Sequence, residues 1–394
     1  MHERDSFFRS IRRLAGFAGI LLAAAGCATA ELDPLPENFA MSDLEWDERA
    51  IWDISADFER LVAQSDALYD APDLQKYVRG VASRLLESQY FHGVPDVRTY
   101  VLGSSDPNAF VLANGALYIT TGLLARLDDE AQLATVLGHE FTHYLYRHYA
   151  RERRAAEQAT AEAALSTLFT LGFAASASEK HRLAEIGSYS QSQELEADEY
   201  GLVLMIAAGY DARNVHRLFE HLRDESEDTA DPETTKYASH PQLSARIAHY
   251  RSLLASQSTS FGQETAGTLN RDEYEMAIDG LLLDNAAVDI DGKRFERAAN
   301  AIERHLQRHP DSARAWFLRG QIARLDDAAA DPLSAYRHAA ELPDPPSEVF
   351  KEIGLLHRER GEQQLAAEAL QIYLRREPDA PDAPILRGFI GEPN

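Results

Sequence analysis

The chain has 394 residues, of which 45% are hydrophobic, so it is long enough for two or three domains with their own cores. Its 64 acidic and 39 basic residues give a formal net charge of −25. This charge argues against a protein that binds nucleic acid along the phosphate backbone, because such a protein needs a basic surface. We interpret the acidity as a solvated, self-repelling surface.

The first 26 residues have the pattern of a bacterial signal peptide of the lipoprotein type. Four arginines precede an apolar stretch at residues 14–25, which is too short to be a comfortable membrane span. Cys27, the only cysteine of the chain, follows this stretch, and we predict that its thiol carries a lipid. The alternative is ordinary cleavage at residues 28–30. Because Ala28 stands where inner-membrane lipoproteins commonly have Asp, we expect an exported, periplasmic protein that is anchored to the outer membrane.

The next segments change from a tether to helices and then to strands. Residues 27–43 contain two prolines and few periodic apolar positions, so we predict a tether. From residue 44 to residue 89 the apolar spacing predicts helices, the second of which begins near Pro72. Residues 97–121 instead show the patterns of strands. An Asn-Gly pair inside this segment predicts a hairpin, since it separates two apolar runs.

Further helices are expected beyond the strands. One begins near Asp128 or Asp129, and the spacing of Asp129 to Gln132 fits a capping box. Residues 150–187 include an apolar stretch that is short for a membrane span, so we predict a buried or lid-forming helix there. Another helix covers residues 190–208 and ends at Gly209.

The C-terminal part contains an internal repeat. It follows a stretch at residues 255–270 that is rich in Ser, Thr, Gly and Gln, which we interpret as a linker. A period of 34 residues with aromatic, small and Pro positions is the tetratricopeptide signature, so we predict an all-α repeat domain at residues 271–394. The alternative is a generic helical bundle. The repeated pairs are Trp316 and Phe350, Gly320 and Gly354, and Tyr336 and Leu370.

The segment His139-Glu140-Phe141-Thr142-His143 has the spacing of a zinc site on a helix. Two histidines at positions i and i+4 lie on one helical face, so both imidazoles can bind one metal ion. Glu140 is placed to take a proton from a water at that ion. Because Zn²⁺ lowers the pKa of bound water to roughly 7, no covalent nucleophile is needed.

A zinc site needs a third protein ligand, and Glu194 is the candidate. Glu194 and Asp198 are i,i+4 neighbours and point the same way. We expect Glu194 to bind one zinc ion per chain while Asp198 accepts the free ring N–H of a ligand histidine, with His139 favoured. Glu196 competes for the third position, but it is rotated about 200° around the helix from Glu194. His148 is rotated away from the ligand face, and we interpret it as structural.

These residues carry a resemblance to a known family. The flanking matches are Leu137-Gly138 and Arg147-His148 around the pentapeptide, and Tyr189-Ser190, Ala197 and Gly201 around the second motif. Over about residues 70–255 the chain resembles the membrane-associated HExxH zinc metallopeptidases of the HtpX, CAAX prenyl endopeptidase and BepA type. The resemblance implies an α+β fold, with a mainly helical, gluzincin-type metallopeptidase domain and a small antiparallel sheet at residues 44–254.

The resemblance also implies where substrate binds. Asn108-Ala109-Phe110 is similar to the edge-strand motif of the family. An unpaired strand beside the metal can hydrogen-bond an extended substrate through the backbone. Asn114 stands where the family usually has Gly, but an Asn can also adopt a positive φ, so we expect the turn to form.

His240-Pro241 follows an acidic stretch at residues 223–236. In BepA-like proteins a His-Pro pair at this place can approach the zinc, so the resemblance implies that His240 gates the site or donates to an oxyanion. The alternative is an ordinary surface histidine before a helix that begins at Pro241. Arg246, one turn into that helix, is a weaker candidate for stabilising an oxyanion or a carboxylate.

Signal, catalytic domain and repeats together resemble the BepA-like periplasmic proteases. We therefore predict an endopeptidase that degrades misfolded or stalled envelope proteins by attack of a metal-activated water. Its repeats would recruit the outer-membrane assembly machinery, because stacked repeats make an extended concave surface. The alternative is an envelope chaperone or assembly scaffold whose zinc site is largely self-inhibited by His240.

Overall fold

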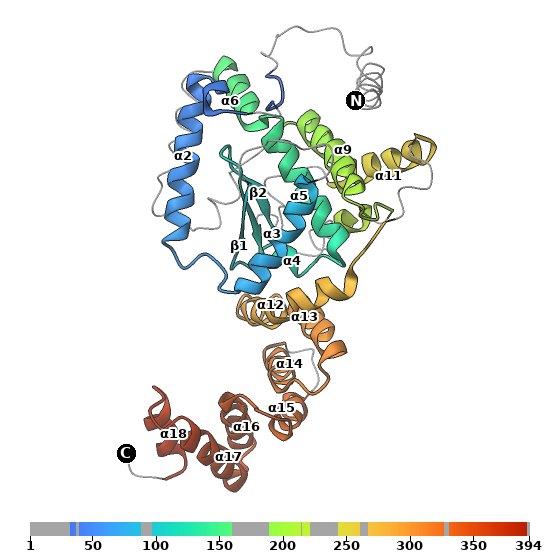
Figure 1. Ribbon diagram of the computed structural model, residues 1–394. Coiled ribbons are helices and arrows are strands. Elements are labelled where there is room, and N and C mark those ends of the chain that lie inside the picture. The colour runs from blue at the N-terminus through green and yellow to red at the C-terminus, as the bar shows by residue number, and fades with distance from the viewer. Residues whose placement is uncertain are drawn as a thin grey trace.

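A computed structural model describes residues 32–36, 39–87, 97–159, 189–213, 215–220, 243–260, 267–326 and 331–391. In an N-terminal part, here called the body, helices between residues 46 and 260 surround a small sheet. The helices between residues 271 and 389 form an arm that extends away from the body (Figure 1). The predicted signal peptide, Cys27, His240 and most of the predicted lid lie outside the described residues. No helix in the described ranges has the length and apolar character to cross a membrane.

Up to residue 260, the described residues of the body form seven α-helices and three strands. The helices are α2 (Trp46–Ala63), α3 (Pro72–Leu86), α4 (Thr121–Leu124), α5 (Glu130–Leu145), α6 (His148–Ala159), α9 (Gln191–Ala207) and α11 (Leu243–Ser260). The strands are β1 (Arg98–Leu102), β2 (Ala109–Val111) and β3 (Ala116–Thr120). The predicted helix starts and stops are confirmed, since Pro72 begins α3, Asp129 caps α5 and Gly209 follows α9 with φ of 87°.

The sheet differs from the prediction of an antiparallel sheet. Its strand order is β1-β3-β2, with β3 antiparallel to β2 but parallel to β1. The chain reverses direction twice between β1 and β3, so the hairpin places β3 between the other strands and parallel to the first. The predicted hairpin itself is confirmed, because Gly115 takes the positive φ of 79° that the turn requires.

Asn114 contributes to this turn in another way than expected. It does not take a positive φ. Its side-chain oxygen accepts from the backbone N–H of Ala116 (3.2 Å), and its amide nitrogen donates to Glu59 of α2 (2.9 Å). Glu59 also accepts from Arg98 of β1 at 2.6 Å. The turn, β1 and α2 are therefore held by one polar cluster.

The crossing of α5 and α9 is unusually close because glycines meet there. A Cβ added to Gly201 would lie 2.7 Å from the backbone nitrogen of His139, and one added to Gly138 would lie 2.9 Å from the carbonyl oxygen of Gly201. Neither position has room for a side chain. This contact brings the first turn of α9 against the HExxH segment of α5.

The C-terminal helices pack as successive neighbours. They are α12 (Arg271–Asp291), α13 (Phe295–Arg308), α14 (Ala313–Leu325), α15 (Pro332–Glu341), α16 (Ser347–Glu359), α17 (Gln363–Arg376) and α18 (Ala383–Phe389). Gly320 lies against Tyr336, and Gly354 lies against Leu370, so the same close contact recurs after 34 residues. The recurrence supports a repeated helical pair in α14–α15 and α16–α17.

Helix α12 belongs to two cores at once. Its first half, including Tyr274 and Ile278, is buried in the main core of the body, and the Tyr274 hydroxyl donates to the carbonyl oxygen of Leu124 (2.6 Å). Its second half, including Leu283 and Ile290, lies in the core of the arm. The predicted linker before it is partly regular structure, since α11 continues to Ser260 and residues 267–268 pair with the backbone after α9. The arm is thus joined to the body through a shared helix.

We predict that Gly201→Ala destabilises the protein by about 1–3 kcal/mol, because the added methyl group forces α5 and α9 apart. Thermal unfolding followed by circular dichroism would show a Tm several degrees below that of the wild type. Gly80→Ala in the interior of α3 is the matched control, since no atom lies within 4 Å of its added Cβ. There the methyl group should be neutral or stabilising. Equal Tm values for both variants would contradict the proposed close packing.

Candidate metal centre

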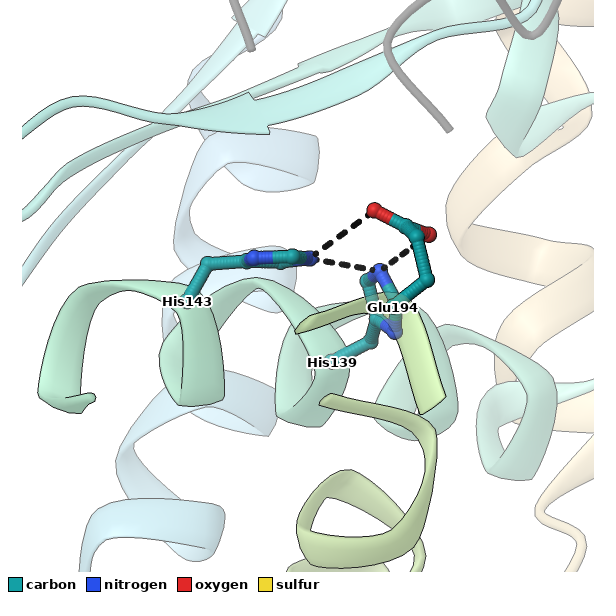
Figure 2. Close-up of side chains that lie close together, drawn as sticks. All are labelled: His139, His143 and Glu194. Carbon is teal, nitrogen blue, oxygen red and sulfur yellow. Dashed lines mark hydrogen bonds and ion pairs between the residues drawn. The ribbon is translucent and has the colours of Figure 1, made fainter. Parts of the chain in front are cut away.

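Three buried side chains converge where α5 meets α9 (Figure 2). His139 and His143 come from successive turns of α5, and Glu194 comes from the first turn of α9. The Nε2 atoms of the two histidines lie 3.0 Å apart. Glu194 places one carboxylate oxygen 3.6 Å from His139 Nε2 and the other 3.5 Å from His143 Nε2. None of the three residues is more than 2% exposed.

The donor set fits a tetrahedral metal ion. Two imidazole nitrogens and a carboxylate are ligands that zinc prefers, and ligand bonds of 2.0–2.2 Å in a tetrahedron place donor atoms roughly 3.3 Å apart. The three separations here bracket that value. A set of three protein ligands leaves a fourth position for water or substrate, as in catalytic rather than structural sites. Glu140 follows His139 in this helix and is fully buried.

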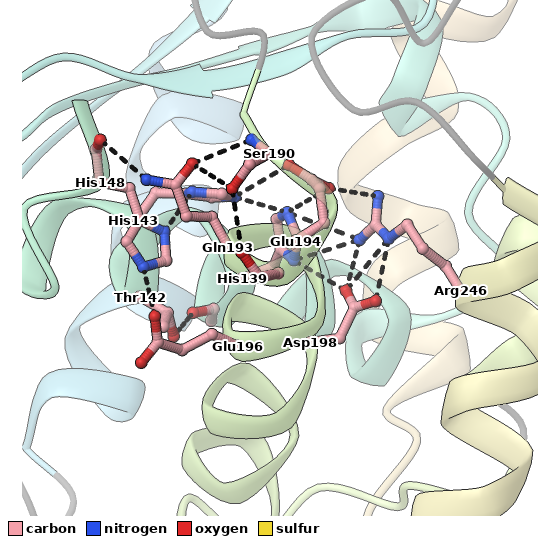
Figure 3. Close-up of polar contacts among 12 residues, drawn as sticks. His139, Thr142, His143, His148, Ser190, Gln193, Glu194, Glu196, Asp198 and Arg246 are labelled. Atoms are coloured by element: carbon pink, nitrogen blue, oxygen red, sulfur yellow. Dashed lines mark hydrogen bonds and ion pairs between the residues drawn. The ribbon is translucent and has the colours of Figure 1, made fainter. Parts of the chain in front are cut away.

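Asp198 lies on the far side of the His139 ring (Figure 3). One of its carboxylate oxygens is 2.9 Å from His139 Nδ1, one helical turn beyond Glu194. An acceptor at Nδ1 fixes the tautomer in which Nε2 keeps its lone pair for a metal. Burial by itself would raise the pKa of Asp198, but Arg246 and His139 hold this pKa well below its usual range. The carboxyl group therefore stays ionised beside the ring.

Arg246 of α11 connects the acidic groups of the site. Its guanidinium contacts Asp198 through Nε (3.0 Å) and Nη2 (2.6 Å), and its Nη1 lies 3.4 Å from Glu194. Although burial lowers the pKa of this side chain, the two carboxylates raise it well above its usual value. Tyr250, one turn later, also donates to Asp198 at 3.0 Å. Arg246 thus contacts both the candidate ligand Glu194 and the carboxylate of Asp198.

His148 lies against the candidate ligand His143, so the expectation that it is rotated away from the ligand face is wrong, while its interpretation as structural stays a prediction. The two Nδ1 atoms are 2.8 Å apart, and His148 Nε2 is 3.0 Å from Glu196. Helix α5 ends at Leu145, and Arg147 takes a positive φ of 56°, which turns the chain back toward the ring. The prediction assumed a helix that continued.

Glu196 is not placed among the ligands. It pairs with His148 and with Arg151 (2.9 Å), and both partners lower its pKa although burial raises it. On the other side, the ring of Tyr189 stacks on that of His143 with centroids 3.8 Å apart. His143 is therefore held on a ring face by Tyr189 and at Nδ1 by His148.

The predicted edge-strand residues lie beside the HExxH helix. Ala109 and Phe110 belong to β2, which is an edge of the sheet in the described part of the chain, and Asn108 directly precedes it. An apolar pocket next to His143 begins where β2 ends. Its lining includes Leu35, Trp52, Val111, Leu112, Tyr144 and Tyr189.

A family model described as peptidase family M48 matches residues 72–254, which include every element of the centre. The match covers 183 of the 394 residues, so the chain is similar to this family over just under half of its length. The resemblance to HExxH metallopeptidases is thereby confirmed. The match also agrees with the donor set, because all three candidate ligands lie within the matched segment.

Relatives of the M48 domain share about 30% identity with it. A putative beta-barrel assembly-enhancing protease of Vibrio cholerae is 29% identical over 59% of this chain and 50% of its own length. The mitochondrial metalloendopeptidase OMA1 of Schizosaccharomyces pombe is 29% identical over 50% and 60%. The metalloprotease YcaL of Escherichia coli is 30% identical over 42% and 65%. The chain thus spans about half the length of the first of these relatives.

We predict that Asp198→Asn weakens Zn²⁺ binding by about 10- to 100-fold, because the neutral amide no longer stabilises the His139 tautomer. Competition with a chromophoric chelator at pH 7 would measure this affinity. Asp211→Asn is the control, since Asp211 is equally buried but pairs with Arg213 away from the centre. An unchanged affinity in Asp198→Asn would exclude a positioning role for this carboxylate.

Proposed function

We propose that the protein is a zinc-dependent endopeptidase. The observation that carries this proposal is the convergence of His139, His143 and Glu194 beside the buried Glu140, within a domain of the M48 family. When bound there, a zinc ion would polarise the scissile carbonyl and lower the pKa of an adjacent water to roughly 7. Three protein ligands and one open position are typical of such hydrolytic centres.

Glu140 would act as the general base and then as the general acid. It takes a proton from the attacking water as the water oxygen bonds to the carbonyl carbon. It returns that proton to the amide nitrogen as the C–N bond breaks, so the products are a carboxylate and an amine. Asp198 and His148 hold the ligand histidines in place during both steps. No covalent enzyme intermediate is required.

The substrate would bind as an extended chain. The resemblance to HExxH metallopeptidases implies that the substrate backbone lies along Asn108-Ala109-Phe110, the last two of which belong to β2. The apolar pocket beside His143 would take a side chain next to the scissile bond. Only a polypeptide that is already unfolded locally can enter in this form.

The cellular role is proposed from the relatives and from the N-terminal sequence. Several relatives are named beta-barrel assembly-enhancing proteases, which agrees with a role in quality control of envelope proteins. The predicted lipid on Cys27 and gating of the centre by His240 remain predictions. If His240 held the centre closed, the protein would act mainly as a chaperone or scaffold, which is the second candidate function.

The helices of the arm would recruit a partner from the outer-membrane assembly machinery. The contact of Gly320 with Tyr336 and its equivalent 34 residues later support a tetratricopeptide arrangement for these helices. Stacked helical pairs of this kind build an extended surface for another protein.

We predict that Glu140→Gln lowers the cleavage rate of casein by about 10²- to 10⁴-fold while zinc content stays at one equivalent in the M48 centre. The amide cannot accept the proton of the attacking water, but it leaves the three ligands in place. Mass spectrometry of the wild-type products should show cleavage in unfolded segments, with apolar residues enriched next to the cut.

Glu303→Gln on the exposed face of α13 is the control and should cleave like the wild type. A tightly folded substrate should resist cleavage until it is unfolded. His240→Ala tests the gate, since its removal should raise the rate if His240 closes the centre. If the wild type and His240→Ala both hold zinc and cleave nothing, the endopeptidase proposal fails.

We predict that deleting residues 347–394 abolishes capture of the envelope partner but leaves casein cleavage within about twofold of the wild type. The deletion removes α16–α18 and keeps α12 and α13, whose Tyr274 and Arg304 contact the M48 domain. Terminal helical pairs contact only their neighbours in such arrays, so the rest should stay folded. Cross-linking in envelope extracts measures capture, and unchanged capture would refute recruitment by the arm.

A further inference from the structure

A second group of metal-ligand side chains lies outside the M48 centre, where α12 meets α13. Asp279 comes from α12, while His305 and His309 are one turn apart on α13. One donor atom from each lies within 4.8 Å of the others, as in the centre at His139. His305 Nδ1 is 3.0 Å from one oxygen of Asp279, and His309 Nε2 is 3.0 Å from the other.

The inner contact of this cluster is not satisfied as a hydrogen bond. Asp279 Oδ1 and His305 Nδ1 are both buried, and neither has a hydrogen-bond partner among the described residues although they face each other. On the opposite side of the ring, His305 Nε2 lies 3.1 Å from the hydroxyl of Ser312. If Nε2–H donates to that oxygen, Nδ1 turns its lone pair toward the carboxylate.

In this tautomer a divalent cation beside the two atoms would accept the lone pairs of both His305 Nδ1 and Asp279 Oδ1. A hydroxyl on the second ring nitrogen is the outer-shell contact that metal-bound histidines commonly make. His309 is half exposed, so a metal ion can enter from solvent and keep a water as its fourth ligand.

We propose that Asp279, His305 and His309 form a second divalent-cation site, with Zn²⁺ as the best match. Two imidazoles and one carboxylate suit zinc better than Ca²⁺ or Mg²⁺, which prefer oxygen ligands only. The M48 centre is separate from this site, because its ligands lie on α5 and α9.

A metal ion at this site would cross-link α12 and α13, where the arm joins the body. Ile278, next to Asp279, is buried in the main core. Arg304, next to His305, pairs with Glu275 and donates to the carbonyl oxygen of Ala125 (2.7 Å). A metal ion that joins α12 to α13 would therefore fix the direction in which the arm leaves the body.

The test is zinc stoichiometry of the full chain after dialysis against a buffer of fixed micromolar free zinc. The wild type should hold two equivalents. His309→Ala should hold one and should lose the part of the zinc-dependent rise in Tm that this site provides. Asp279→Asn should behave like His309→Ala. His338→Ala, which removes an exposed histidine of the same arm, is the matched control and should keep two equivalents.

The two sites can be told apart by their variants. His143→Ala removes a ligand of the M48 centre and should leave one equivalent, and the double variant with His309→Ala should leave none. If the M48 centre did not bind zinc, the wild type would hold one equivalent and His309→Ala none. Equal zinc content in the wild type and His309→Ala would overturn the proposal, because the cluster would then be an ordinary ion pair.

Discussion

The close crossing of α5 and α9 is the constraint on which the metal centre depends. The two helices meet at Gly138 and Gly201, where a single methyl group would collide with the backbone of the other helix. The distances between the candidate ligands leave little room for movement of the helices. Each carboxylate oxygen of Glu194 lies near a different histidine, at about the separation that tetrahedral coordination requires. A larger residue at the crossing would widen every one of these separations together.

Each candidate ligand histidine is also held at its Nδ1 atom by a neighbouring side chain. Asp198 contacts His139 and is itself paired with Arg246. His148 contacts His143 and is itself paired with Glu196. Both supporting carboxylates come from α9, the helix that also provides the metal-ligand carboxylate. One helix therefore determines the position of the third ligand and the orientation of the other two.

Short-range signals in the sequence predicted most of the body. The i,i+4 spacing of His139 and His143, the cap at Asp129 and the turn at Gly115 each depend on neighbours within a few residues, so they could be recognised without the fold. The position of Asp198 followed in the same way from its spacing to Glu194.

Features that depend on distant contacts were missed. The parallel pairing of β1 with β3 requires knowledge of which strand lies in the middle. The contact of His148 with His143 requires the positive φ at Arg147, which no residue type there demands. The burial of Tyr274 in the body requires a partner surface far away in the sequence, so a boundary between body and arm was expected before α12.

Helix α12 contributes residues to the hydrophobic cores of both the body and the arm, so it couples their stabilities. Tyr274 and Leu283 belong to different cores but to one helix, so neither core can lose that helix without disrupting the other. A molecule that binds only the folded arm would therefore also lower the population of the unfolded peptidase domain, by linkage and without touching it. A molecule whose arm has no partner bound would then unfold more often than one with a partner. Other proteases would therefore degrade it faster.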